Sequence, residues 1–223
     1  MIAKLIGYTQ VSESPGLENV QELIAYCARV SNPSNQINSE TSEKLLKYLI
    51  KHKHWSPFEM VSATVEVQCT RDIARQLLRH RSFSFQEFSQ RYANVDEFGD
   101  NMFEVCDARL QDPKNRQNSI EHDDIELRKE WVSQQQVVIE ATKSAYEWAI
   151  ENGIAKEQAR KVLPEGLTMS RLYVNGTLRS WIHYIELRSD NGTQKEHRKL
   201  AIECAKAIAT IFPMANDFYT SET

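Results

Sequence analysis

The stretch RHRSFSFQEFSQRY, residues 79–92, holds the densest group of functional side chains in the 223-residue sequence. Its three arginines, one histidine, one glutamate and three serines are interleaved with the rings of Phe83, Phe85, Phe88 and Tyr92. A solvated run of charges does not interleave apolar rings, and a buried core segment would desolvate three guanidinium groups without partners. We therefore predict that residues 79–92 form a polar, anion-receiving pocket with aromatic walls.

The segments on either side of this stretch have clear periodicities. Residues 60–69 alternate between apolar and polar side chains, which predicts a half-buried strand of an antiparallel sheet. Residues 71–80 repeat apolar side chains at helical spacing, and residues 82–88 lose that period, so a helix should be followed by an extended or irregular segment. Three polar side chains fall at i, i+3 and i+4 of this helix and should share one neighbourhood: Gln76, Arg79 and His80.

The remaining periodic segments complete the expected fold. Strands are predicted at 2–8 and 168–174, and helices at 17–30, 41–50, 125–152, 156–163, 177–188 and 194–212. Residues 94–124 are polar and weakly periodic, so we expect a variable excursion or lid with some local helix. Because no repeat or Gly/Ser linker divides the chain, residues 1–223 are predicted to form a single α+β domain, with an antiparallel-type sheet flanked by long helices.

Composition narrows the class of protein. The net charge of −4 provides no global field for nucleic acid, so an anion site must be a local cluster. No apolar run approaches the ~20 residues of a membrane span, and the N-terminus lacks the layout of a signal peptide. The four cysteines are far apart and form no CxxC pair. We therefore expect a cytoplasmic protein with reduced thiols, without membrane or nucleic-acid partners.

Phosphate groups would have to be held by side chains. The sequence contains no GxGxxG or GxxxxGK[ST] motif and only 7 glycines, which argues against a backbone phosphate cradle. Arginine binds phosphate bidentately, and although a single arginine is more often a surface ion pair, several together favour an anion site. The candidate arginines are Arg79, Arg81, Arg91, Arg160, Arg179 and Arg188.

The predicted helix 177–188 carries functional candidates in two sectors. Arg179 and His183 lie four residues apart and share one helical face, whereas Arg188 projects from a different sector. If all three side chains act in function, this helix separates two ligands, or the contributions of two subunits.

Histidines and cysteines have competing interpretations. One interpretation of His52, His54 and Glu59 is a metal site. A second is an exposed helix terminus, where cationic side chains complement the helix dipole. A third is that His54 and Ser56 form hydrogen bonds with a cofactor. No cysteine has a histidine beside it in sequence, and three lie on apolar faces, so the cysteines are interpreted as core residues and not as nucleophiles.

Residues 79–92 resemble the signature RHRxxSxNxxSxRY of the flavin-dependent thymidylate synthases. Every fixed position matches except one, because Gln86 stands where the family usually has Asn. The resemblance continues, in family order, through ARVS, HKHWSPFEM, ARQLLRHR, ARKVLP and NGTLRSWIHYIELR, at residues 28–31, 52–60, 74–81, 159–164 and 175–188. It covers most of the chain apart from residues 94–124.

The resemblance implies both the reaction and the assembly. Members of the family methylate dUMP to dTMP, taking the carbon from 5,10-methylenetetrahydrofolate and the reducing equivalents from NADPH through FAD. The family forms homotetramers whose active sites are shared between subunits. This chain is therefore expected to be an FAD-dependent methyltransferase of dTMP biosynthesis, with dUMP, folate and copies of itself as partners.

The resemblance also assigns site residues by position. The dUMP contacts would be Gln76, Arg79, Glu87, Ser89, Gln90, Arg91, Arg160 and Arg188. The FAD contacts would be Ser31, His54, Ser56, Arg79, His80, Arg81, Glu87, Thr177, Arg179 and His183. The family often has Thr at the position of Ser56 and Asn at that of Thr177, and no metal is implied.

Arg188 resembles the family residue credited with activating the pyrimidine. A permanently charged guanidinium stabilises negative charge at N3 and O4 of uracil and is a poor general base, so we expect electrostatic catalysis without an enzymic nucleophile. Ser89 has no evident base and would orient dUMP.

Two other classes of function compete with this prediction. Arginines beside stacking aromatics are also typical of RNA- or nucleotide-binding modules, although this chain lacks an extended basic stripe. A metal-dependent nucleotide hydrolase would be built on His52, His54, Glu59 and His80.

Overall fold

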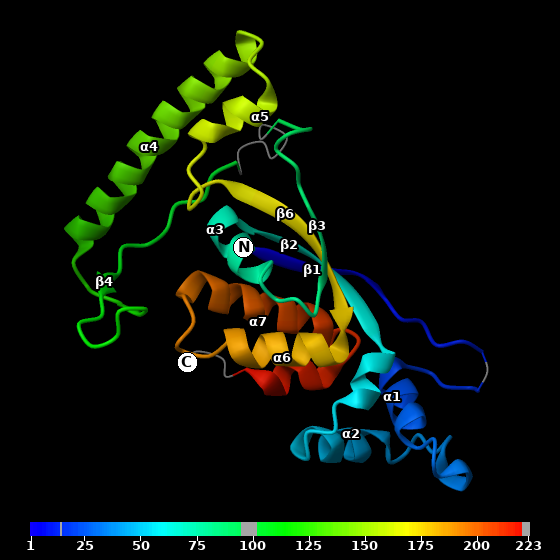
Figure 1. Cartoon of the computed structure of the whole chain (residues 1–223). Coiled ribbons are helices and arrows are strands. Elements are labelled where there is room, and N and C mark those ends of the chain that lie inside the picture. Colours follow the sequence, from blue (N-terminus) through cyan, green and yellow to red (C-terminus); the bar gives the residue numbers. More distant parts are fainter. Residues whose placement is uncertain (14, 95–101, 220–223) are drawn as a thin grey trace.

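A four-stranded antiparallel sheet organises the chain, for which a computed structural model describes residues 1–13, 15–94 and 102–219. The strands lie in the order β1-β2-β6-β3 (Figure 1). They are β1 (Ile2–Tyr8), β2 (Ser62–Thr70), β6 (Met169–Thr177) and β3 (Ser84–Glu87). The predicted antiparallel sheet is therefore confirmed, and the centre of the stretch 79–92 is its edge strand β3.

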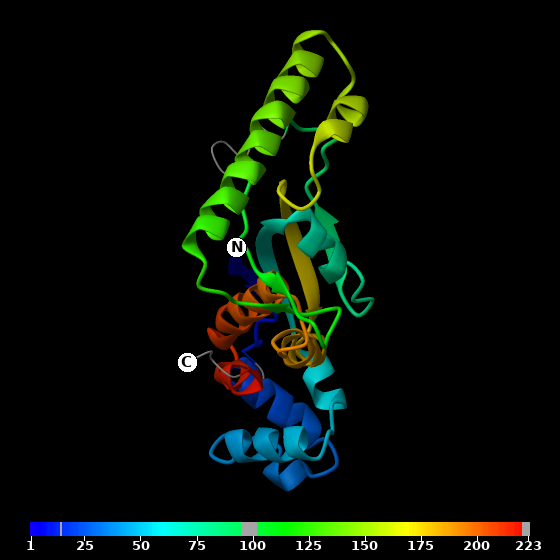
Figure 2. The same ribbon diagram turned by 90° about the vertical axis from the view of Figure 1, so that its left-hand side faces the viewer.

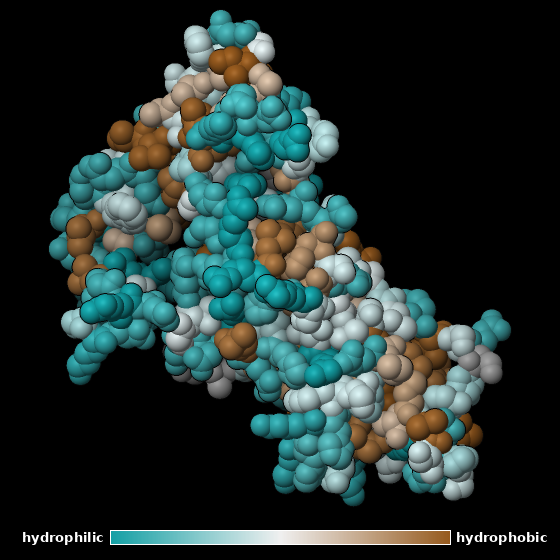
Figure 3. Space-filling model, in the orientation of Figure 1, coloured by the Kyte–Doolittle hydropathy of each residue, from teal (hydrophilic) through white to brown (hydrophobic). Residues whose placement is uncertain are grey.

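The helices cover one face of the sheet and extend beyond both of its ends. They are α1 (Val20–Ala28), α2 (Ser42–Lys51), α3 (Arg71–Leu77), α4 (Ile125–Glu151), α5 (Lys156–Ala159), α6 (Leu178–Arg188) and α7 (Lys195–Ala209). Helices α6 and α7 lie side by side against the sheet, whereas α4 projects as a long arm (Figures 1 and 2). Apolar side chains reach the surface along this arm (Figure 3). No helix in the described part of the chain is long and apolar enough to cross a membrane.

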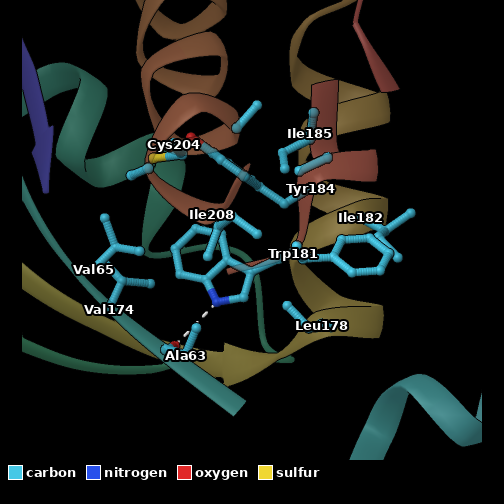
Figure 4. Packing of buried hydrophobic residues seen from close by; sticks show 14 of the residues in the cluster. Ala63, Val65, Val174, Leu178, Trp181, Ile182, Tyr184, Ile185, Cys204 and Ile208 are labelled. Carbon is cyan, nitrogen blue, oxygen red and sulfur yellow. Dashed lines mark hydrogen bonds between the residues drawn. The ribbon is translucent and has the colours of Figure 1, made fainter. Parts of the chain in front are cut away.

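The main core lies between the sheet and helices α6 and α7. Trp181 is fully buried there, and its indole N–H donates a hydrogen bond of 3.1 Å to the carbonyl of Ala63 in β2 (Figure 4). Cys69 and Cys204 are also fully buried, and burial raises the pKa of the Cys69 thiol to about 12. The interpretation of these two cysteines as core residues is confirmed, whereas Cys27 is only partly buried.

Element boundaries differ from the predicted ones for local reasons. Pro57 and its neighbours form a 3₁₀ turn, η2 (Ser56–Met60), so β2 starts two residues later than expected. Helix α3 ends at Leu77 because the N–H groups of Arg79 and His80 bond to carbonyls three residues back, which tightens and closes the helix. Strand β6 continues to Thr177 because β2 pairs with it as far as Ser62 opposite Thr177.

The predicted excursion is tied to the body of the protein. It contains a small hairpin of β4 (Leu110–Gln111) and β5 (Ser119–Ile120), and Phe103 bridges to Thr168 beside β6. The expected local helix is wrong for residues 102–124, which contain none, and residues 95–101 lie outside the described residues. The Asp112 carboxylate accepts the N–H groups of Lys114 and Asn115, a side-chain turn that competes with a helix.

Candidate active site

The stretch 79–92 is anchored by an aromatic ring in the core. After α3 the chain turns, and Phe83 inserts between Trp181 and Tyr184, with ring centroids 4.6 and 5.8 Å away. Gly176 of β6 leaves room for this ring, because a Cβ there would lie 2.3 Å from it. Phe83 is therefore a buried anchor, and the prediction that it forms a wall of the pocket is wrong.

His80 and Arg188 meet although 108 positions separate them in the sequence. The Nε of Arg188 donates to Nε2 of His80 over 2.9 Å. Burial and the neighbouring Arg188 charge lower the pKa of His80 to about 4, so the ring is neutral near pH 7. A neutral ring that accepts at Nε2 carries its proton on Nδ1. The sequence assigned His80 to the flavin and Arg188 to dUMP, so this hydrogen bond links the two predicted sets.

A second histidine, His197 of α7, borders this pair and was missed by the sequence analysis. Its ring is fully buried, 6.4 Å from that of His80 between centroids, and its Nδ1 lies 3.1 Å from Oε1 of Gln76. Burial, followed by the charges of Arg188 and His80, lowers its pKa to about 3. Because His197 lies on the apolar face of an amphipathic helix, its pattern in the sequence is that of a core residue.

The N-terminal half of α6 faces a different group of predicted residues. Arg179 forms an ion pair with Glu59, and His183 packs edge-on against Trp55 with centroids 4.8 Å apart. Both partners belong to residues 54–60, the segment that includes His54 and Ser56. The prediction that Arg179 and His183 share one face, separate from Arg188, is confirmed by these contacts.

Thr177 and Ser31 border the same region. Thr177 is the N-cap of α6, where its hydroxyl accepts the N–H of Ser180 over 3.3 Å. Ser31 is exposed in the turn after α1, a helix that packs against η2. The predicted flavin contacts at the N-terminus of α6 and in residues 54–60 are therefore neighbours, and Ser31 follows a helix that contacts the same segment.

Glu87 ends β3 and is held by two residues that were not predicted. Its carboxylate accepts the hydroxyl of Ser170 over 3.0 Å and lies 3.4 Å from the guanidinium of Arg71. Arg71 opens α3 and Ser170 lies in β6, so the carboxylate is fixed where these elements meet. Neither partner carried a signal in the sequence, because each contact spans a long stretch of chain.

The last part of the stretch leads toward α5. Arg91 lies 3.6 Å from Glu157, and Arg160 follows directly after that helix. Gln90 is buried, and its Nε2 has no hydrogen-bond partner among the described residues. Ser89 forms a turn in which its carbonyl accepts the N–H groups of Tyr92 and Ala93.

The chain therefore arranges the predicted residues in three groups. Gln76, His80 and Arg188 surround His197; the flavin candidates line α6 and residues 54–60; residues 87–91 lie toward α5. Arg79 and Arg81 are exposed. A cavity of about 360 Å³ beside the N-terminus is lined by none of the predicted site residues. This cavity is therefore not where the predicted contacts lie.

The residues proposed for a metal-dependent hydrolase are not gathered. Glu59 pairs with Arg179, and His80 bonds to Arg188. Within residues 1–13, 15–94 and 102–219, no group of three or more His, Cys, Asp or Glu side chains is arranged to hold a metal ion. The hydrolase hypothesis has no structural support in the described chain.

Comparison with known proteins agrees with the resemblance seen in the motif. The family model described as "Thymidylate synthase complementing protein" matches residues 5–214. A "Probable flavin-dependent thymidylate synthase" of Paramecium bursaria Chlorella virus 1 is 50% identical over 213 residues, 96% of each chain. The flavin-dependent thymidylate synthase of Synechocystis sp. is 50% identical over 192 residues, covering 86% of this chain and 85% of the relative.

A solved structure supports the same assignment. The UMP/dUMP methylase PolB from Streptomyces cacaoi, bound with 5-Br dUMP, superposes with a TM-score of 0.80 at 26% identity, over 97% of this chain and 93% of that one. The family match spans most of the sequence, and the curated relatives align along nearly their whole length. The chain therefore belongs to the flavin-dependent thymidylate synthase family.

Proposed function

We propose that this chain catalyses the reductive methylation of dUMP to dTMP, with 5,10-methylenetetrahydrofolate as carbon donor and NADPH as reductant through FAD. The observation that carries the proposal is the hydrogen bond between Arg188 and His80. It places the residue assigned to the pyrimidine against a residue assigned to the flavin, as a reaction between two bound ligands requires.

The chemistry of the donors fits a phosphate-bearing flavin. Arg81 and Arg179 are exposed guanidinium groups, and His54, Ser56 and Thr177 add imidazole and hydroxyl groups near the same helix end. These residues would hold FAD, which when bound supplies the redox chemistry that passes reducing equivalents from NADPH. The exposed ion pair of Arg179 with Glu59 is a weak contact for an anionic ligand to replace.

The residues of the chain would act on dUMP by electrostatics. Arg188 donates through Nε to His80, which orients its guanidinium and leaves the two terminal nitrogens as donors for a ligand. A fixed positive charge at the pyrimidine stabilises the negative charge that develops at N3 and O4 when C5 becomes nucleophilic. Neutral His80 stabilises this orientation without competing as a cation.

We infer that residues 1–223 act as one catalytic domain in a homotetramer with shared active sites. Large apolar side chains are exposed on the α4 arm and on the edge strand β1, as at Trp131, Val137, Trp148, Ile2 and Ile6. Patches of this kind on a soluble chain mark interaction surfaces. The three separate groups of site residues would be completed by neighbouring copies. Sedimentation of the purified protein as a monomer in the presence of FAD would contradict this assembly.

Absorbance and isotope release test the reaction. The purified protein should show a flavin spectrum that NADPH bleaches, and it should release tritium from C5-labelled dUMP when folate and reductant are supplied. Well-folded protein that does not bind FAD on reconstitution would overturn the proposal. Salt-sensitive RNA binding without turnover would instead favour the RNA-binding alternative.

Variants separate the two ligands. Arg188→Ala should cut turnover strongly and keep the flavin spectrum, whereas His80→Ala should weaken flavin retention. Arg116, exposed in the turn between β4 and β5, offers a matched arginine whose substitution to Ala should change neither property. If Arg188→Ala loses FAD but regains full turnover when FAD is added, the assignment of Arg188 is wrong.

A further inference from the structure

The side-chain amide of Gln76 is held at both ends by the start of α7. Its Oε1 lies 3.1 Å from Nδ1 of His197, and its Nε2 donates to Oε1 of Gln194 over 2.8 Å. An amide oxygen only accepts, so the contact with His197 requires the imidazole proton on Nδ1. The carboxylate of Glu196 can only accept, so Gln194 donates to it and presents its own oxygen to Gln76, which selects one orientation of the Gln76 amide. In that orientation Oε1 accepts from His197.

Gln194 is itself held in place by Glu196 of α7, which Arg109 of the excursion binds in turn. Its Nε2 donates to Glu196 over 3.1 Å, and Arg109 binds both oxygens of Glu196 at 2.6 and 2.8 Å. Burial is the largest single influence and would raise the pKa of Glu196, but the hydrogen bonds and charge of Arg109, a backbone N–H and the Gln194 amide together hold that pKa below its usual range. Glu196 therefore stays ionised and accepts from both partners.

Among the described residues, His197 makes no other polar contact that would explain a histidine at this position. The ring is fully buried, and its Nε2 has no hydrogen-bond partner within the described chain. A buried polar atom without a partner is unfavourable, and an apolar side chain would avoid it. The bond from Nδ1 to Gln76 is the feature that only a polar side chain supplies.

We propose that His197 is a positioning residue for the nucleotide, which fixes the Gln76 amide so that its second N–H is presented to dUMP. The inference rests on the proposed function, which assigns Gln76 to dUMP. One amide N–H is used by Gln194, so the other remains for a ligand. If the amide turned over, an oxygen would replace that donor and repel the same acceptor on the ligand.

The test compares dUMP affinity in two variants of the FAD-loaded protein, measured by calorimetry. His197→Leu fills the site without a donor, whereas His197→Asn retains a side-chain N–H close to the position of Nδ1. We expect His197→Leu to weaken dUMP binding by about 5- to 10-fold, the effect of one hydrogen bond, and His197→Asn to stay within about 3-fold of the parent. The flavin spectrum and the KM for NADPH should remain unchanged in both.

A second background separates positioning from general damage. When Gln76→Ala removes the amide, adding His197→Leu should cause no further loss of dUMP affinity. An equal loss in both backgrounds, or no loss with Gln76 present, would overturn the inference. If His197→Leu does not fold, Gln194→Ala can be used instead, because it removes the other hydrogen bond to the Gln76 amide and Gln194 is exposed. Unchanged dUMP affinity in Gln194→Ala would also overturn the inference.

The two proposals fail in different ways. A parent protein that does not bind dUMP overturns the proposed function. A parent that binds dUMP as well as its His197→Leu variant overturns only the role of His197.

Discussion

Gly176 is the position where adding one methyl group should disturb the site most directly. An ideal Cβ at this residue would lie 2.3 Å from Cδ1 and 2.5 Å from Cε1 of Phe83. The ring cannot swing aside into solvent, because it is buried and packs against Trp181 and Tyr184. Gly176→Ala therefore forces either β6 or Phe83 to move.

The expected magnitude follows from the size of that overlap. Ordinary contacts begin near 3.4 Å, so the ring must shift by roughly 1 Å inside a packed core, and overpacking of this kind costs about 1–3 kcal/mol. For a chain of about this length, each kcal/mol lowers the melting temperature by about 2–4 °C. Phe83 follows His80 by three residues, so the displacement should also loosen the hydrogen bond to Arg188 and reduce flavin retention.

Thermal unfolding of the FAD-loaded protein, followed by tryptophan fluorescence and flavin release, measures this effect. Gly7→Ala is the matched control, because a Cβ there meets nothing within 4 Å, and it should melt within about 1 °C of the parent. Adding Phe83→Leu to Gly176→Ala should recover part of the loss, since a smaller side chain removes the overlap. A Gly176→Ala protein that melts like the Gly7→Ala control would refute the steric argument.

The remaining predictions concern stability. Lys53 has a φ of 57°, so Lys53→Gly should stabilise the fold by about 0.5–1 kcal/mol in urea unfolding, whereas Lys44→Gly inside α2 should cost about 1 kcal/mol. Trp181→Phe removes the hydrogen bond to the Ala63 carbonyl and part of a fully buried ring, and it should cost about 1–3 kcal/mol, against less than about 0.5 for Trp148→Phe on the exposed arm. The pKa of His197 is about 3 in the folded protein and about 6.5 in the unfolded chain. As the pH falls below about 6.5, the unfolded chain therefore binds a proton that the folded protein does not, and the free energy of unfolding decreases. Between pH 6.5 and 4.5 unfolding free energies should fall by about 2–3 kcal/mol more in the parent than in His197→Leu.

The elements with strong periodicity were predictable from the sequence, and those set by tertiary contacts were not. Alternation over residues 60–69 identified the buried face of β2, and helix α4 agrees with its predicted range to within one residue. The extent of β6 depends on its pairing with β2 along its whole length, which its own residues do not show. The hairpin of β4 and β5 replaces an expected helix because Asp112 bonds to the backbone locally.

The residue types of the candidate site were predictable, but their pairing was not. The motif identified His80 and Arg188, yet their contact joins the end of α3 to the end of α6 and has no local signature. His197 lies on an apolar helical face, where the sequence pattern predicts a core residue. Its contact with Gln76 becomes apparent only in the three-dimensional structure. Contacts between distant segments decide these roles, and periodicity carries no information about them.

The strand register locates the one departure from the family motif. In β3, Phe85 and Glu87 face the core side opposite Val174 and Leu172, whereas Gln86 pairs with Tyr173 and is exposed. The longer amide of Gln86 therefore lies on the open face of the sheet, away from the contacts of Glu87 with Arg71 and Ser170. An effect of Gln86 on ligand binding would therefore act at the exposed face of the sheet and not through the contacts of Glu87.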